Sequence, residues 1–512
     1  MLSHILLSLF IWFPILGGVL CIVMGHRGVS NEAVRWVATL LAILLLALCI
    51  PLYLGFDPSR WQMQFTEFLP WIPALNINYS LGVDGISVLF IILTCFTTLI
   101  IVLSSWKVVH IKVAQFMAVF LISAGIMNGA FESRDAILFY SFWEASMIPM
   151  YLGIGVWGGA RRSYASIKFF LYTFLGSIFL LVAFLYLYTQ SGSFNISSFD
   201  ALHIPGKVAD LLFLAFLAAF AVKIPMWPVH TWLPDAHTEA PSGGSVVLAA
   251  LMLKMGAYGF LRFSFPILPG IHASTEWFLI GLSLVAIIYV GFAALAQKDM
   301  KRLIAYSSIS HMGLVTLGIF AVFMILGKTH DSTEAMISVQ GAMFQMIAHA
   351  FSSGGLFIGV GYLYDRFGSR LMRDYQGLAS TMPVFAAFYM LFAMANVGLP
   401  GTSGFVGEFL IIIAVFKANF WIAAGAAFTV VIAPAYTLWM YKRVLFGDPR
   451  GKVHEKVQGA DIGGLELAVF VLLAIPIVFF GVYPEPILAI SHASVGHFVE
   501  MIMSKIPAGV YS

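Results

Sequence analysis

Charged residues are scarce in this sequence. Only 10% of its 512 residues are charged and 61% are hydrophobic, whereas a soluble domain usually carries about 25% charged residues. A soluble core cannot bury this much apolar surface, so the lipid bilayer must be the main solvent of the chain. The formal net charge is only +3, and the basic residues form no patch that would favour nucleic acid.

Cysteine and nucleotide-binding motifs are nearly absent. Cys21, Cys49 and Cys95 lie far apart without CxxC spacing, which argues against a disulfide framework, a zinc site and iron–sulfur ligation. No Walker A sequence occurs, and the GxGxxG-like letters at 153–158 end an apolar segment instead of following a strand. We therefore expect neither ATP hydrolysis nor dinucleotide binding.

Long apolar segments, in contrast, fill the chain. Windows of about 20 apolar residues, the length of a membrane-spanning helix, predict fourteen spans. Their bounds are 3–24, 33–55, 81–105, 113–131, 134–156, 163–189, 209–229, 243–265, 275–297, 303–327, 336–364, 382–415, 418–440 and 462–490. The first lacks the features of a cleaved signal peptide, so we expect it to be retained. The prediction is an all-α polytopic membrane protein.

Lysine and arginine are distributed unevenly among the loops. Eighteen lie in one alternate set, including the basic loop 441–461, and six lie in the other set with the C-terminal tail. Because basic loops remain cytoplasmic, both termini are predicted on the non-cytoplasmic side. The remaining three, Lys223, Lys254 and Arg262, lie inside spans. Arg262 is near a span end, from which its side chain can snorkel to the surface.

Six ionisable residues lie deep in the apolar segments. They are Glu144, Lys223, Lys254, His311, His349 and Glu408. A charge at bilayer depth costs roughly 2.5–3.5 kcal/mol on insertion scales. A static ion pair or a hydrogen-bonded histidine is the simpler explanation for any one of them. Six together favour a path for protons or cations.

Proline and glycine interrupt two of the spans. "VKIPMWPVHTWLPDAHTEAPSGG" contains Lys223, and "NVGLPGTSGFVGEFL" contains Glu408. Either break alone could be a packing kink, but irregular backbone in membranes usually lines a cavity. The breaks lie five spans apart and therefore cross in opposite directions, which is typical of inverted repeats. The predicted units are helices 1–3 (1–112), a first five-helix repeat (113–265), a second, inverted repeat (266–446), and helix 14 with the tail (447–512).

Five motifs resemble one membrane-protein family. They are "FWEASMIPMYLGIGVWG", "AVKIPMWPVHTWLPDAHTEAPSGGSVVLAALMLKMGAYGFLRF", "DMKRLIAYSSISHMG", "MIAHAFSSGGLF" and "GLPGTSGFVGEF". Together they look like an antiporter-like membrane subunit of respiratory complex I. Subunits of multisubunit cation/proton antiporters share the central motifs and are the alternative. The resemblance implies fourteen helices, with helices 7 and 12 broken, and proton translocation within an NADH:quinone oxidoreductase.

The resemblance also implies a setting for this chain. No cofactor and no metal are expected in it, because FMN, the iron–sulfur clusters, NADH and quinone are bound by other subunits. Lipids and other membrane-arm subunits, especially neighbouring antiporter-like ones, are the expected partners. The expected location is the bacterial inner membrane, with both termini periplasmic. By motif position, the resemblance assigns proton transfer to Glu144, Lys223, Lys254, His311, His349 and Glu408.

Glu144 and Lys223 are expected to act as a switch. Burial disfavours a charged amine, and a nearby carboxylate restores the charge. Lys223 should therefore hold its proton when Glu144 is close and release it to Lys254 when Glu144 is distant or neutral. His311 and His349 would pass the proton on to Glu408, and water would fill the gaps between the side chains.

Overall fold

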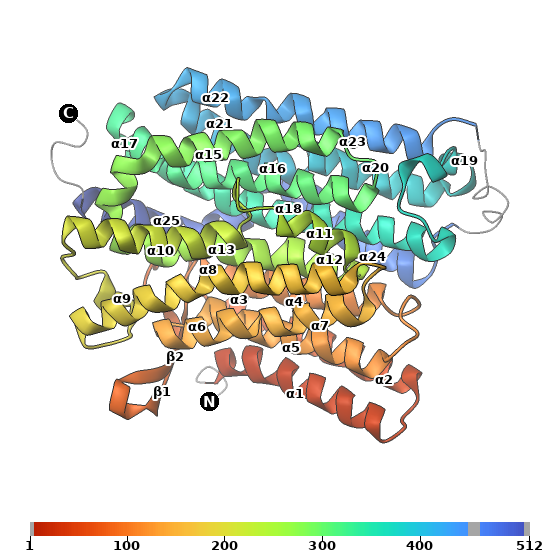
Figure 1. Cartoon of the computed structure of the whole chain (residues 1–512), viewed down its shortest axis with the longest axis horizontal. Helices are drawn as coiled ribbons and strands as arrows, with labels where there is room; N and C mark the ends of the chain where they lie inside the picture. Colours follow the sequence, from red (N-terminus) through yellow and green to blue (C-terminus); the bar gives the residue numbers. More distant parts are fainter. Residues whose placement is uncertain (1–4, 449–460, 506–512) are drawn as a thin grey trace.

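The computed structural model describes residues 5–448 and 461–505. Within them the chain is almost entirely helical apart from one β-hairpin (Figure 1). Apolar segments become helices in lipid because a helix satisfies its own backbone hydrogen bonds. The predicted all-α polytopic fold is confirmed. Part of the basic loop 441–461 and the end of the unit 447–512 lie outside the described residues, and the division into repeats stays a prediction.

Helices of the first half follow the predicted spans. The crossings are α1 (Leu6–His26), α2 with α3 (Asn31–Ala47, Cys49–Gly55), α4 (Ser87–Ser104), α5 (Val113–Glu132), α6 with α7 (Ala136–Ala145, Met147–Trp157), α8 (Arg162–Ser191) and α10 with α11 (Gly206–Lys223, Trp232–Glu239). The eighth runs through α12 (Ser242–Val247), η3 (Leu248–Met252), α13 (Leu253–Gly259), η4 (Phe260–Ser264) and α14 (Phe265–Ile267). The short α9 (Ile196–Phe199) lies between α8 and α10.

The second half continues the same pattern. Its crossings are α15 (Pro269–Leu295), α16 (Met300–Phe320), α18 (Ser332–Phe367), α20 with α21 (Pro383–Val397, Ser403–Ala418), α22 with α23 (Phe420–Ala427, Thr429–Leu445) and α24 (Leu465–Val482). Shorter elements are α17 (Val322–Thr329), η5 (Met372–Asp374) and α19 (Leu378–Thr381). If each broken pair, α10 with α11 and α20 with α21, is counted as one crossing, the described residues contain fourteen.

Both predicted helix breaks are confirmed. The first separates α10 from α11 at 224–231, and the second separates α20 from α21 at 398–402. The indole of Trp232 donates a hydrogen bond to the Val222 carbonyl at 2.9 Å, which satisfies a group that the end of α10 leaves free. The predicted bounds 209–229 are too short, because the crossing resumes as the buried α11 after its break.

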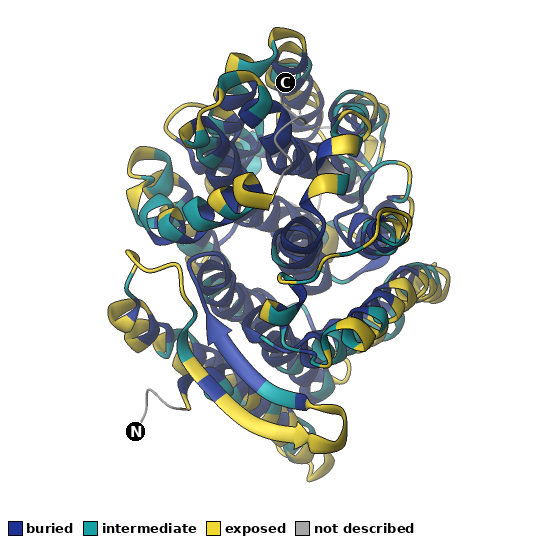
Figure 2. Ribbon diagram, turned by 90° about the vertical axis from the view of Figure 1, so that its left-hand side faces the viewer, coloured by how far each residue is buried: buried dark blue, intermediate teal, exposed yellow. Residues whose placement is uncertain are grey.

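A β-hairpin lies on one face of the bundle. Strand β1 (Gln64–Ile72) pairs antiparallel with β2 (Ile77–Val83), the two being joined by η2 (Pro73–Leu75). Figure 2 looks onto this face, where β2 is mostly buried and β1 mostly exposed. The Glu67 carboxylate accepts hydrogen bonds from the Leu7 and Ser8 amides, so the hairpin caps the free amides at the start of α1.

The last described helix, α25 (Glu485–Lys505), lies across this hairpin face. It is long and apolar enough to span a membrane. However, Ser494 accepts a hydrogen bond from the Gly85 amide, and Lys505 donates to the Pro266 carbonyl. These partners lie at the ends of crossings on one side of the bundle. The predicted span 462–490 is therefore wrong at its end: α24 stops at Val482, and α25 is a surface helix.

Candidate functional site

The six predicted residues differ in how far their side chains are buried. Lys223, Lys254, His311, His349 and Glu408 each expose 3% or less of their surface. Glu144, on α6, is half-buried. Because α6 lies in a membrane span, the exposed part of the Glu144 side chain faces lipid or a neighbouring protein.

Lys254 lies at the centre of the chain's buried polar groups. It follows the π-helical turn η3, and its Nζ donates to the Ala249 carbonyl of that turn. π-Helical turns are rare and occur mostly at functional sites. The same Nζ lies 2.9 Å from Nδ1 of His349 on α18. An amine and an imidazole in direct contact can exchange a proton without an intervening water.

His311 and Glu408 form a second contact pair. Nδ1 of His311 lies 3.0 Å from the Glu408 carboxylate, to which Gln345 also donates at 3.1 Å. The rings of His311 and His349 have centroids 5.7 Å apart. The four groups from Lys254 to Glu408 therefore form one array, interrupted only between the two imidazoles. Two of the three steps are thus direct contacts, and the expectation that water fills the gaps stays a prediction for the step between the two imidazoles.

Lys223 and Glu144 are close in the fold but not in contact. The Lys223 ammonium donates to the Trp143 carbonyl at 3.3 Å and to the Ser146 hydroxyl at 3.1 Å, and it lies 4.0 Å from the Trp143 ring centroid. Among the described ion pairs none joins Lys223 to Glu144, whose Oε1 is buried without a hydrogen-bond partner. In this structure the expected pair is open, and Trp143 and Ser146 hold the lysine.

A glycine brings the helices of the two lysines together. A Cβ at Gly256 would lie 2.6 Å from the Ile224 nitrogen and 2.8 Å from the Phe220 carbonyl oxygen. Such a close approach of two backbones requires glycine. The helix carrying Lys254 therefore packs directly against the broken end of α10, which carries Lys223.

The second break holds its charged residue differently. Lys223 precedes the first break, whereas Glu408 follows the second by more than one helical turn and points back to it. A Cβ at Gly398 would lie 2.8 Å from the Glu408 Oε2, and Gly398 has φ +77°. The two breaks therefore share the interruption but differ in where the charged residue lies relative to it.

We expect Gly398→Ala to destabilise the protein. The left-handed backbone costs an L-residue about 1–2 kcal/mol, and the new methyl group would press on the Glu408 carboxylate. The measurement is the thermal unfolding midpoint of the purified protein. Gly281→Ala is the control, since a Cβ there meets nothing within 4 Å. Equal midpoints for the two variants would contradict the expectation.

Two buried basic residues were missed by the sequence reasoning. His237 on α11 is fully buried and stacks on Phe357 with centroids 4.5 Å apart, and neither ring nitrogen has a hydrogen-bond partner. Lys301 was assigned to a loop, but it is buried and donates to the Ala240 carbonyl at 2.7 Å. The break at 224–231 could have indicated that His237 is buried. A discontinuous span continues beyond its interruption, and His237 lies in that continuation.

A polar cavity of about 370 Å³ opens near Lys301, on the face opposite α25. Glu239, Lys301, Asp365 and Arg370 are among the residues that line it. Arg370 forms ion pairs with Glu239 at 3.5 Å and with Asp299 at 3.4 Å. The cavity therefore brings a charged, water-accessible surface to the buried amine of Lys301.

Arg262 does not snorkel as the sequence suggested. Its guanidinium forms an ion pair with Asp84 at 2.8 Å, and both side chains are largely buried. This ion pair joins the end of the eighth crossing to the turn before α4, on the hairpin face.

The side chains of the site are of types that can take up and release protons. One buried amine contacts an imidazole, and a second imidazole contacts a carboxylate, in the middle of the bundle. No group of three or more metal-ligating side chains occurs among the residues that the structure describes. Fold and site define a polytopic membrane protein with discontinuous helices around a buried array of ionisable side chains. The chain belongs to the NADH:quinone oxidoreductase/Mrp antiporter transmembrane family, whose family model matches residues 133–433.

Individual relatives agree with this assignment. The chain is 45% identical to NADH-quinone oxidoreductase subunit M of Rhodobacter capsulatus, over 97% of this chain and 96% of the relative. A chain of respiratory complex I from Thermus thermophilus with bound NADH is 30% identical, with a TM-score of 0.86 over 97% of this chain and 99% of that one. A chain of the Mrp complex from Dietzia sp. DQ12-45-1b shares the fold at 19% identity, with a TM-score of 0.85 over 98% and 100%. The predicted resemblance is confirmed.

Proposed function

We propose that this chain is a proton-translocating membrane subunit of an NADH:quinone oxidoreductase. The observation that carries the proposal is the buried array from Lys254 through His349 and His311 to Glu408, with contacts of 2.9 and 3.0 Å at its two ends. Relatives named as subunits of that enzyme support the same activity. Quinone reduction elsewhere in the complex would drive the transfer.

The proposed path begins at the cavity beside Lys301. His237 lies within electrostatic range of both Lys301 and Lys254, so it can relay a proton from the cavity to Lys254. From Lys254 the proton passes to His349, then across the gap between the rings to His311 and Glu408. Because the groups interact, their protonation belongs to the array as a whole and not to single residues.

The trigger is the Glu144–Lys223 pair. With Glu144 ionised and close, Lys223 keeps its proton by direct attraction. With the pair open, as in this structure, the ammonium has only the Trp143 carbonyl, the Trp143 ring and the Ser146 hydroxyl as partners. The helix that carries Lys254 packs at Gly256 against the end of α10 that carries Lys223, so a movement of Lys223 on opening or closing of the pair would be passed to the helix of Lys254.

The surface of the molecule supports a proposal for its neighbours and its orientation in the membrane. Glu144 is half-exposed inside a membrane span, which favours a neighbouring antiporter-like subunit over lipid as its cover, because an acid facing lipid is costly. The cavity at Lys301 lies on the side of the basic loops, so that side would be cytoplasmic and the α25 side periplasmic. FMN, iron–sulfur clusters, NADH and quinone would be held by other subunits of the complex.

Glu144→Gln tests the trigger. We expect the complex to assemble, because the amide keeps the shape of the side chain, and we expect proton pumping to fall by roughly 100-fold, within the range of a lost acid–base group. Pumping is measured with a pH-sensitive dye in inverted membrane vesicles supplied with NADH. Glu132→Gln is the control, because Glu132 is also buried in a span but lies outside the array. Wild-type pumping in an assembled Glu144→Gln complex would refute the switch.

A further inference from the structure

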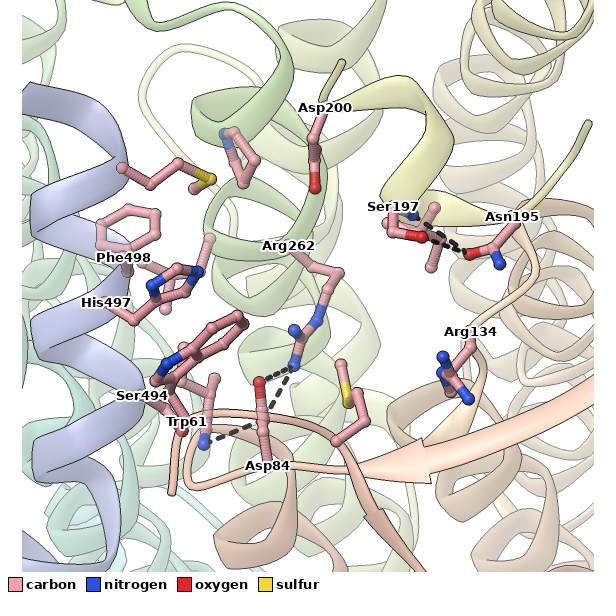
Figure 3. Close-up of a pocket in the computed structure, with 16 residues that line it drawn as sticks. Trp61, Asp84, Arg134, Asn195, Ser197, Asp200, Arg262, Ser494, His497 and Phe498 are labelled. Atoms are coloured by element: carbon pink, nitrogen blue, oxygen red, sulfur yellow. Dashed lines mark hydrogen bonds and ion pairs between the residues drawn. The ribbon is translucent and has the colours of Figure 1, made fainter. Parts of the chain in front are cut away.

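A second cavity, of about 190 Å³, lies beside α25 on the hairpin face (Figure 3). Its lining comes from the segment before β1, the turns before α4 and α6, α9, η4, α14 and α25. The turns before α4 and α6 and the elements η4 and α14 are ends of crossings, so the cavity lies at the level of the membrane–water boundary. It is smaller than the roughly 300–1,000 Å³ of pockets for drug-sized ligands, and it fits a small polar group.

The polar side chains on the floor of the cavity are already paired with other groups of this chain. Asp84 pairs with Arg262 at 2.8 Å and also accepts hydrogen bonds from the Ile86 and Ser87 amides. Trp61 stacks on His497 with ring centroids 3.6 Å apart and forms one wall. A ligand must therefore be recognised by other groups of the lining.

Arg134 is the first group with free capacity. Its backbone is fixed on both sides, since its amide donates to the Ser80 carbonyl and its carbonyl accepts from Ile196. Its guanidinium has no ion pair or hydrogen bond in the described chain, and Figure 3 shows it beside the opening. Burial lowers the pKa of Arg134, and no neighbouring carboxylate opposes this effect. Gly82 leaves room for the side chain, because a Cβ there would lie 2.6 Å from the Arg134 Cδ.

Asp200 is the second such group, and it has the opposite charge. It follows α9, and its Oδ1 is buried without a hydrogen-bond partner. Burial raises the pKa of Asp200 to about 6, although Lys505 and Arg262 oppose the shift. The Lys505 ammonium bonds the backbone carbonyls of Asp200 and Pro266. In Figure 3 the Asp200 carboxyl points toward the opening from the side opposite Asp84.

We propose that this cavity binds the headgroup of a phospholipid that carries both a phosphate and a primary ammonium, as in phosphatidylethanolamine. The phosphate would accept charge-assisted hydrogen bonds from Arg134, and the ammonium would donate to Asp200. An anionic headgroup would leave the Asp200 carboxylate unpaired, and a lone cation would leave Arg134 unpaired. Only a zwitterion satisfies both groups.

The position of the cavity favours a lipid over a protein segment. It lies where headgroups lie, and Phe498, Met501 and Pro266 line it with apolar surface on which the glycerol end of a lipid can pack. Its volume of about 190 Å³ holds a headgroup but not a folded segment.

The test uses the intact complex reconstituted in vesicles of equal parts phosphatidylethanolamine and phosphatidylglycerol. After detergent extraction, native mass spectrometry counts the lipids that remain bound. We expect retained phosphatidylethanolamine to fall about tenfold or more in Arg134→Gln and in Asp200→Asn, since each removes one charge-assisted contact. Arg60→Gln and Asp57→Asn are the matched controls, because they break an exposed ion pair on the same face.

Acidification provides an independent readout. The charged and titratable groups around Asp200 are Lys505, Arg262, Arg134, Asp84 and His497. An ammonium ligand needs the ionised carboxylate, so retention should fall as the pH drops below about 6, where Asp200 takes up its proton. In Asp200→Asn the remaining retention should lack this step.

Several results would overturn the proposal. They are equal retention of phosphatidylethanolamine in the site variants and the controls, equal retention of phosphatidylglycerol by the wild type, and displacement of the bound lipid by inorganic phosphate. Cross-linking from an azide-bearing residue at Ser197 to a neighbouring subunit instead of a lipid would also overturn it. If Arg134→Gln fails to assemble, Arg134→Lys retains one charge and should give intermediate retention.

Discussion

Replacing Lys254 by methionine is expected to abolish proton translocation while the complex still assembles. Methionine has a similar length and suits the buried position, but it removes the Nζ that contacts both the Ala249 carbonyl and His349. Loss of a positioned acid–base group lowers a rate by roughly 10²–10⁴-fold. The measurement is proton pumping in inverted vesicles, normalised to the amount of assembled complex.

Lys254→Arg separates proton transfer from a static charge. Arginine keeps the positive charge but does not release its proton at working pH. We therefore expect this variant to assemble and to pump no better than Lys254→Met. Near wild-type pumping by Lys254→Arg would mean that the site needs only a fixed charge, and the relay from Lys254 to His349 would have to be abandoned.

Glu408→Gln is expected to have the second large effect. The amide can still contact His311 and Gln345, which both approach the Glu408 Oε1 in the wild type, but it cannot take up a proton. Pumping should fall by about 100-fold or more, with the complex intact on a native gel.

Glu132→Gln is the matched control for Glu408→Gln. Glu132 is fully buried at the end of α5, and neither carboxylate oxygen has a hydrogen-bond partner. It does not contact any member of the array, so we expect near wild-type pumping. Equal losses in the two variants would show that pumping is sensitive to any buried acid, and Glu408 would lose its assigned role.

The sequence was most informative where a residue type conflicts with its surroundings. Lys223, Lys254 and Glu408 stand in long apolar segments, and the cost of a charge in lipid is high enough to make each a candidate on its own. The two helix breaks were predictable for the same reason, because proline and glycine are expensive inside a spanning helix. The all-helical architecture followed from the apolar windows alone.

Contacts between distant residues could not be predicted in this way. Lys254 and His349 are 95 residues apart in sequence, and His311 and Glu408 are 97 apart. Helical periodicity says which face of a helix a residue occupies, but not which helix packs against that face. The direct contacts within the array, and the open Glu144–Lys223 pair, depend on that packing.

The missed residues share a different cause. His237, Lys301, Arg134 and Asp200 lie in polar stretches near the ends of spans, where charged residues are ordinary. Their importance comes from burial or from the lack of a partner, and both depend on the tertiary structure. For the last predicted span, 462–490, the apolar window ran past the end of α24 at Val482 into the first residues of the surface helix α25.

The position of α25 has a consequence for biogenesis. It follows all fourteen crossings in the chain, so the ribosome produces it after the rest of the bundle has emerged. Its contacts reach Gly85 before α4, Pro266 at the end of the eighth crossing and Gln340 near the start of α18. Docking of this helix therefore joins early, middle and late parts of the polypeptide, so α25 can reach its position only after α4, the eighth crossing and α18 have packed together.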